Sequence, residues 1–119
     1  MKKLTFVQSM NAWKDAMHRK DRSKLDELLS EDFIWENIAM EGKNSKEETI
    51  QFSLNIKDEV PSFRIGECQS LFESDEILVG SHGVHQDDRD DTIVLCVVNL
   101  CDKGSKIKMW RHLRGESLK

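Results

Sequence analysis

Acid–base chemistry near neutral pH is the reaction type best supported by these side chains, because imidazole is the usual proton carrier there. The sequence contains four histidines: His18, His82, His85 and His112. His82 and His85 are three residues apart in a segment typical of a strand, so they point to opposite faces and one metal ion could not bind both. His112 alternates with Trp110 and Arg114, so these side chains share one strand face. His112 and His82 are therefore the candidate catalytic residues, each as a proton shuttle.

Aromatic residues give a second signal, for a ligand site. The sequence has three tryptophans (Trp13, Trp35 and Trp110), five phenylalanines and no tyrosine. A tryptophan buries a large apolar area and keeps one N–H for orientation, so it suits the wall of a pocket as well as a core. The absence of tyrosine excludes chemistry that needs a phenol hydroxyl.

Length and composition describe an acidic protein and exclude several functional classes. The 119 residues suit a single domain, residues 1–119, with a formal net charge of −4. The three cysteines lack CxxC spacing, which argues against a zinc site or a disulfide framework, and we expect no metal and no cofactor. The sequence shows no apolar run long enough to span a membrane and no apolar centre of a signal peptide, so we predict a cytoplasmic protein.

Hydrophobic periodicity predicts helices first and antiparallel strands afterwards. The first helix is expected from Phe6 to Met17, the second after a Ser23–Asp26 capping pair, and the third after a Ser45–Glu48 capping box, ending at Pro61. Strands are expected over residues 33–38, 63–72, 76–86, 92–100 and 106–114. This order predicts an α+β fold in which helices cover one face of a curved, mostly antiparallel sheet.

Several short motifs follow one another along residues 6–114. They are Trp13 to Asp21, then Leu25, Leu28-Leu29 and Glu31-Asp32-Phe33, then Gly42 before the third helix, and Asp102 to Ile107 before the last strand. In order and spacing they resemble the nuclear transport factor 2-like superfamily, in its SnoaL-like and ketosteroid-isomerase-like branch. The resemblance implies a cone-shaped, cystatin-like roll with three N-terminal helices. In such a roll the sheet curls around the first helix and leaves an apolar pocket at its open end.

The resemblance also implies which residues lie at that pocket: Trp13, Trp35 or Asn37, Val97, Trp110, His112 and Arg114. Ketosteroid isomerase chemistry needs a carboxylate base, a tyrosine and a protonated aspartic acid. The corresponding positions here look like Asn37, Trp13 and Val97, none of which can take those roles, unless a shift of one residue makes Glu36 the base. Periodicity leaves open whether the Trp110 face or the Arg111 face of the last strand lines the pocket.

Two charged segments favour solvated surface rather than a binding site. The run from Asp87 to Asp91 lacks the glycine and the closing glutamate of an EF-hand calcium loop. Lysines and arginines make the hairpin after residue 102 basic, but the acidic net charge and the lack of a nucleic-acid motif argue against a phosphate-binding track. We therefore expect no nucleic-acid partner and no membrane partner.

Together these observations predict a domain that binds an apolar or aromatic small molecule in a Trp-lined pocket and catalyses no reaction. Its ligand-binding residues would be Trp13, Trp35, Asn37, Val97, Trp110 and Arg114. The alternative is a small isomerase, cyclase or hydratase, in which His112 or His82 shuttles protons and Arg114 is a charge partner. Valine and leucine side chains between residues 93 and 100 would remain exposed on the outer sheet face, which predicts a homodimer through that face.

Overall fold

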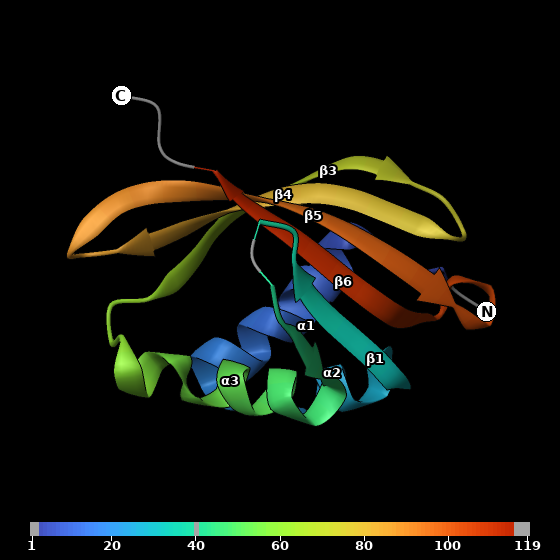
Figure 1. The fold of residues 1–119 in the computed structure, drawn as a ribbon, viewed down its shortest axis with the longest axis horizontal. Helices are drawn as coiled ribbons and strands as arrows, with labels where there is room; N and C mark the ends of the chain where they lie inside the picture. The colour runs from blue at the N-terminus through green and yellow to red at the C-terminus, as the bar shows by residue number, and fades with distance from the viewer. Residues whose placement is uncertain (1–2, 40, 116–119) are drawn as a thin grey trace.

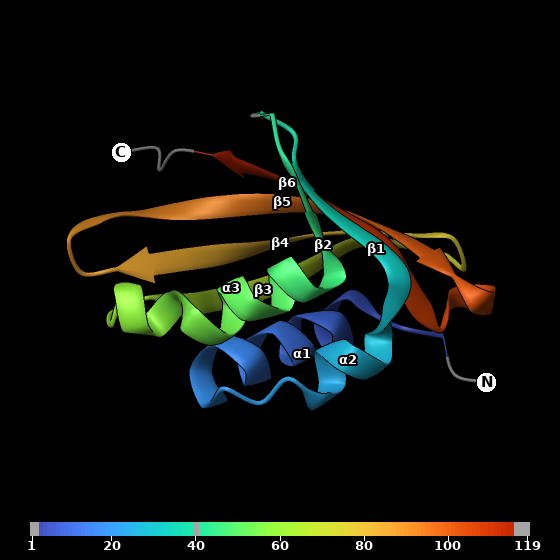
Figure 2. The same cartoon turned by 60° about the horizontal axis from the view of Figure 1, so that its bottom comes forward.

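The computed structural model describes residues 3–39 and 41–115 of the chain. In chain order its elements are α1 (Phe6–Arg19), α2 (Ser23–Leu28), β1 (Leu29–Asn37), β2 (Lys43–Ser45), α3 (Lys46–Glu59), β3 (Arg64–Glu73), β4 (Ile77–Gln86), β5 (Arg89–Cys101), a 3₁₀ turn (Asp102–Gly104) and β6 (Lys106–Gly115). All three helices lie on the same side of one sheet (Figure 1, Figure 2). The α+β class predicted from the sequence is therefore confirmed.

The six strands form one mixed sheet in the order β2-β1-β6-β5-β4-β3. β1 runs parallel to β6, whereas the other neighbouring pairs are antiparallel, so the prediction of a mostly antiparallel sheet is also confirmed. Alternate residues of β5, such as Val94, Cys96 and Val98, are buried against the helices, and we call their side the inner face. Ile93 and Leu95 belong to the opposite, outer face, where they are exposed.

The first helix is held by local contacts at both ends and by one hydrogen bond to a distant strand. Thr5 and Gln8 form a capping box at its start, with the Thr-x-x-Gln spacing typical of this motif. Glu73, at the end of β3, also accepts a hydrogen bond from the backbone N–H of Phe6 at 2.8 Å. Lys20 ends the helix in a left-handed conformation with φ of 55°. These contacts fix the position of α1 over the inner face of the sheet.

The other two helices confirm one predicted cap and correct another. Ser45 and Glu48 form the predicted capping box at the start of α3. The Ser23–Asp26 pair does not cap α2; instead, the Arg22 side chain donates hydrogen bonds to Asp26 and also to Glu47 of α3. Arg22 thereby joins two helices that are far apart in the sequence, which local pattern analysis does not detect.

The strands differ from the prediction in three places, the first being that β1 begins at Leu29 rather than at residue 33. A short strand, β2, precedes α3 and pairs with β1, so strands separate the second helix from the third. Arg89, Asp90 and Asp91 belong to β5, so the expected acidic link is reduced to the turn at Asp87 and Asp88. None of the helices in residues 3–39 and 41–115 has the length and the apolar run that a membrane crossing requires.

Candidate functional site

Pairing with β5 decides which face of the last strand points inward. Trp110, His112 and Arg114 of β6 lie opposite Val98, Cys96 and Val94 respectively. These three β5 residues are all buried on the inner face. Adjacent residues of neighbouring strands point to the same side of a sheet, so Trp110, His112 and Arg114 also belong to the inner face. The question that periodicity left open is settled in favour of the Trp110 face.

Two of the three tryptophans lie in the core and contact each other: Trp13 belongs to α1 and Trp110 to β6. Trp13 is 5% exposed and Trp110 is 3% exposed, and their rings meet edge to face with centroids 5.2 Å apart. Phe6 stacks on the other side of Trp110 at 6.0 Å. The indole Nε1 of Trp13 is buried and has no hydrogen-bond partner among the described residues. This donor is an unusual feature of the core, because buried polar groups are nearly always paired.

The third tryptophan lies at the border between the core and the half-buried part of the inner face. Trp35 of β1 is aligned with Trp110 and meets the imidazole of His112 edge-on, with ring centroids 4.6 Å apart. Both Trp35 and His112 are half-buried. The structure therefore brings all three predicted tryptophans to one face, but only Trp35 combines an aromatic surface with partial exposure.

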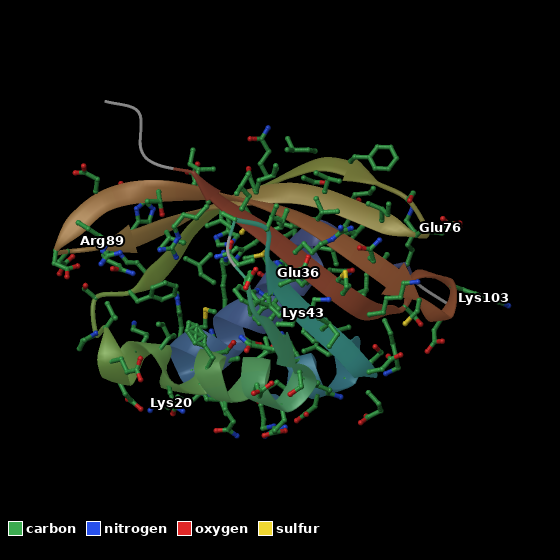
Figure 3. All side chains as sticks on the ribbon, in the orientation of Figure 1. Lys20, Glu36, Lys43, Glu76, Arg89 and Lys103 are labelled. Atoms are coloured by element: carbon green, nitrogen blue, oxygen red, sulfur yellow. The ribbon has the colours of Figure 1, made fainter. Side chains whose placement is uncertain are left out.

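The acidic position expected from the family resemblance carries no carboxylate on the inner face. Asn37 is aligned with His112, and its side-chain oxygen accepts a hydrogen bond from the backbone N–H of Ala39 at 3.0 Å. Glu36 points to the outer face and pairs with Lys43 at 3.7 Å, as Figure 3 shows on the β1–β2 ribbon. The register shift that would have made Glu36 a base is therefore excluded by strand alternation.

His82 lies on the inner face of β4, opposite Val94 on one side and Cys68 on the other. Its Nδ1 is 3.1 Å from the carbonyl oxygen of Gly83, and since a carbonyl only accepts, Nδ1 carries the proton in this contact. Burial lowers the pKa of His82, and the positive charges of Arg114 and Lys14 add to this effect. His82 is therefore neutral at pH 7, with Nε2 as a proton acceptor.

His112 is also held in its neutral form. Burial, followed by the charges of Arg114 and His82, lowers the pKa of His112 to about 4. Burial and the nearby Arg89 lower the pKa of Arg114 as well. Arg89 lies at the tip of the β4–β5 hairpin in Figure 3. The permanently charged groups that act on His82 and His112 are thus Arg114 and Lys14, which are both cations.

Lys14 and Cys68 join the site, although the sequence analysis did not name them as site residues. Cys68 of β3 is directly opposite His82, and a hydrogen bond from Lys14 of α1 acts on its thiol. Burial raises the pKa of Cys68 despite this lysine. Lys14 is adjacent to Trp13 in the sequence, but only the packing of α1 on β3 shows that it reaches Cys68. No local signal could have revealed that contact.

Val97 corrects one site prediction. It is aligned with Arg111 on β6 and lies between the inward-pointing Cys96 and Val98, so it belongs to the outer face. His85 also lies on the outer face, where its Nδ1 is 2.8 Å from Asp91. His82 and His85 therefore occupy opposite faces, as predicted. Within the described ranges, no group of three or more histidine, cysteine or acidic side chains is placed to hold a metal ion.

A hollow of about 410 Å³ is lined by residues of α1 and α2, and it shares Lys14 with the inner-face site. Its walls are Asn11, Lys14, Asp15, His18, Arg19 and Lys24. Asp15 forms an ion pair with Lys24 at 2.9 Å. His18 is exposed, and its Nε2 accepts a hydrogen bond from the backbone N–H of Ile65 at 3.4 Å. This hollow contains none of the predicted ligand-binding residues.

Comparisons with known proteins agree on the fold. No protein-family model matches the sequence, and a comparison with curated proteins gives no match either. Solved structures do match. A protein of the SnoaL-like family from Agrobacterium tumefaciens is 16% identical with a TM-score of 0.70, covering 92% of this chain and 94% of that one. An NTF2-like protein of unknown function from Burkholderia xenovorans is 9% identical with a TM-score of 0.70, covering 95% and 84%.

The chain has the nuclear transport factor 2-like fold. The fold implied by the sequence motifs is therefore confirmed, and a protein of the SnoaL-like family is among the structural neighbours. A third neighbour is an epoxide hydrolase from M. tuberculosis, 16% identical with a TM-score of 0.60, covering 92% of this NTF2-like chain and 81% of its own. Fold alone does not assign an activity.

Proposed function

We propose that this NTF2-like chain is a small-molecule-binding domain whose ligand occupies the inner face beside Trp35 and His112 and is not chemically changed. The observation that carries the proposal is the indole N–H of Trp13, which is buried without a partner among the described residues. An unpaired buried donor costs about 1–3 kcal/mol, so a ligand oxygen placed there would recover that free energy. Trp35 would supply the aromatic contact.

The absence of a suitable base supports binding over catalysis. The inward position at the end of β1 is Asn37, whose oxygen is already used by the Ala39 N–H. The neighbouring Glu36 is on the outer face with Lys43. Proton abstraction of the ketosteroid isomerase type therefore lacks its carboxylate at this position.

A second candidate function is catalysis by histidine, and the protonation state of His82 favours it. A neutral imidazole with a free Nε2 can accept a proton from a bound substrate. His112, which is also neutral, would provide a second proton-transfer group on the same face. In this case the domain would be a small isomerase, cyclase or hydratase, with Arg114 stabilising the developing negative charge.

Native mass spectrometry of the purified protein, searching for a co-purifying small molecule, tests the proposal directly. A ligand identified in this way is expected to raise the melting temperature, and Trp13→Phe is expected to weaken its affinity about tenfold because one hydrogen bond is lost. His85→Gln, on the outer face, is the matched control and should leave the affinity unchanged. Equal affinity in Trp13→Phe would contradict the role given to the indole.

Incubation of that ligand with the protein separates the two candidate functions. Binding alone predicts that its mass is unchanged after prolonged incubation. Catalysis predicts conversion that is lost in His112→Gln or His82→Gln while affinity is retained.

We also propose a homodimer through the outer face, in the cytoplasm. Ile93, Leu95 and Leu113 are 64%, 38% and 39% exposed, and Leu95 is directly opposite Leu113. A second copy would cover this apolar surface. Sedimentation equilibrium is expected to give a dimer that Leu95→Glu dissociates, whereas Gln69→Glu on the edge strand β3 should not. A monomeric unmodified protein at micromolar concentration would contradict this proposal.

A further inference from the structure

We propose that the ligand carries an anionic group next to its flat apolar body, and that Arg114 and Lys14 hold this anion. The inference rests on the proposed function and specifies the chemistry of the ligand. It uses a row of side chains that crosses four strands of the inner face. This row consists of Arg114 on β6, Val94 on β5, His82 on β4 and Cys68 on β3.

The row places a cation at each of its ends. Arg114 begins it, and Lys14 of α1 lies near the other end, where its charge acts on Cys68 and His82. Neighbouring strands are about 4.8 Å apart, so the backbone of Arg114 is separated from that of His82 by about 10 Å. Val94, the residue between them, is short and 1% exposed. The charges of Arg114 and Lys14 both act on His82, which lies between them in the row.

The charges in this region are not balanced. Among the described residues, neither Arg114 nor Lys14 forms a salt bridge, whereas nearby basic side chains such as Lys24 do. Bringing cations onto a partly buried face without a counterion is unfavourable. A carboxylate or similar anion on the row would satisfy both side chains, and charge-assisted hydrogen bonds are the strong ones.

The remaining parts of the inner face suit an apolar aromatic body. Trp35 offers a half-buried ring beside His112, and the Trp13 indole provides a donor within the core. An aromatic carboxylate would fit both halves, with its ring near Trp35 and its charge toward Arg114. A neutral aromatic molecule would leave the cations unpaired, and an aromatic cation would be repelled.

Anion binding also has a consequence for the two histidines. Arg114 and Lys14 lower the pKa of His82, and Arg114 lowers the pKa of His112. A bound anion would offset these cations, so at least one histidine pKa should rise. Binding of an anion is then coupled to proton uptake at mildly acidic pH, which a neutral ligand does not produce.

Isothermal titration calorimetry with three matched probes tests the inference: 2-naphthoate, 2-naphthamide and 2-naphthylmethylammonium. At pH 7 and low salt we expect 2-naphthoate to bind at least tenfold more tightly than the amide, and the ammonium to bind most weakly. Added salt should reduce the preference, because it screens charges. Repeating the titration at pH 6 in buffers of different ionisation enthalpy should show proton uptake for 2-naphthoate alone.

Variants then assign the preference to the row. Arg114→Gln and Lys14→Gln are each expected to reduce the preference for 2-naphthoate over the amide by about threefold to tenfold. Lys108→Gln is the matched control, since Lys108 is exposed on the same strand as Arg114. Arg114 is exposed, so its replacement should not prevent folding. If Lys14→Gln proves unstable, Arg114→Gln alone therefore still tests the inference.

The outcomes separate this inference from the proposed function. Equal affinity for 2-naphthoate and the amide would overturn the anion and leave the binding domain standing. Tighter binding of 2-naphthylmethylammonium than of 2-naphthoate would also overturn the anion and leave the binding domain standing. No binding of any of the three probes would overturn the inference and would also count against an aromatic ligand on this face. If Lys108→Gln reduces the preference for 2-naphthoate over the amide as much as Arg114→Gln does, the assignment of this preference to the row is wrong.

Discussion

The ring of Phe6, at the start of α1, lies directly against Gly80 of β4. A Cβ atom added at Gly80 would be 2.4 Å from the nearest ring carbon, which is closer than real Cβ contacts. Phe6 is fully buried and stacks on Trp110, so it has no free space into which it could move. The missing side chain of Gly80 is therefore what allows α1 to approach the sheet.

Gly80→Ala is expected to destabilise the protein by about 1–3 kcal/mol, because overpacking forces the helix away from the sheet. Chemical denaturation measures this change. Gly83→Ala is the matched control on the same strand, where the nearest atom to the added Cβ is 3.4 Å away on the His85 ring. We expect Phe6→Leu to recover part of the lost stability in the double variant. If Gly80→Ala and Gly83→Ala lower the stability equally, contact with Phe6 is not the reason that position 80 requires glycine.

The hydrogen bond from Phe6 N–H to Glu73 links the start of α1 to the end of β3. Glu73→Ala is expected to lower the free energy of unfolding by about 1–2 kcal/mol, because a helix donor loses a charged acceptor. Glu67→Ala, at an exposed position of the same strand, should change it by less than about 0.5 kcal/mol. Denaturant midpoints for the two variants provide the comparison. If the midpoints coincide, the link is not important for stability.

Stability should fall in mildly acidic solution because His112 is protonated more easily when the chain is unfolded. The ordinary histidine pKa is 6.5, and in the folded protein that of His112 is lowered to about 4. Between these values the unfolded state binds more protons, so stability decreases as pH falls from 6.5 toward 4. The pKa values of His82 and His18 are lowered too, so they act in the same direction.

We expect protonation of His112 to lower the free energy of unfolding by about 1–2 kcal/mol at pH 5 relative to pH 7.5. Denaturation of His112→Gln at the two pH values should show a smaller difference than the unmodified protein, while His85→Gln retains the His112 contribution. Carboxylates such as Glu47, whose pKa is lowered to about 2, lose their contribution only at lower pH. An imidazole NMR titration of His112 with a midpoint at 6 or above would refute this explanation.

The two core tryptophans should respond differently to replacement. The indole of Trp110 makes a hydrogen bond to the Cys96 thiol, whereas that of Trp13 has no partner among the described residues. Trp13→Phe removes an unsatisfied donor, which partly offsets the lost packing. It is therefore expected to cost less stability than Trp110→Phe, by about 1 kcal/mol, in the same denaturation assay. The reverse order would indicate that the Trp13 N–H finds an acceptor in solution.

The sequence predicted what depends on short-range pattern. Ser45 and Glu48 cap α3 because the required spacing is local, and alternation correctly placed Trp110, His112 and Arg114 on one face. Thr5 and Gln8 carried the same capping signal and were overlooked.

The rest depends on contacts between distant segments. Which face of β6 points inward follows from its pairing with β5, and Val97 was misplaced for the same reason, since it is aligned with Arg111. The Lys14–Cys68 contact requires knowledge of how α1 packs on β3. Charge balance on the inner face could not be predicted, because it depends on cations from several elements.

The parallel pairing of β1 with β6 also affects how the protein folds. Strands β3 to β6 are joined by short turns and can pair with their sequence neighbours, but β1 must find a partner that is synthesised much later. Such non-local pairing is slow. The Trp35–His112 contact spans the β1–β6 pair. The register of this pair is interrupted between Leu29 and Ile34. We therefore expect the site to assemble late in folding, and a ligand that bridges β1 and β6 would stabilise this non-local strand pair.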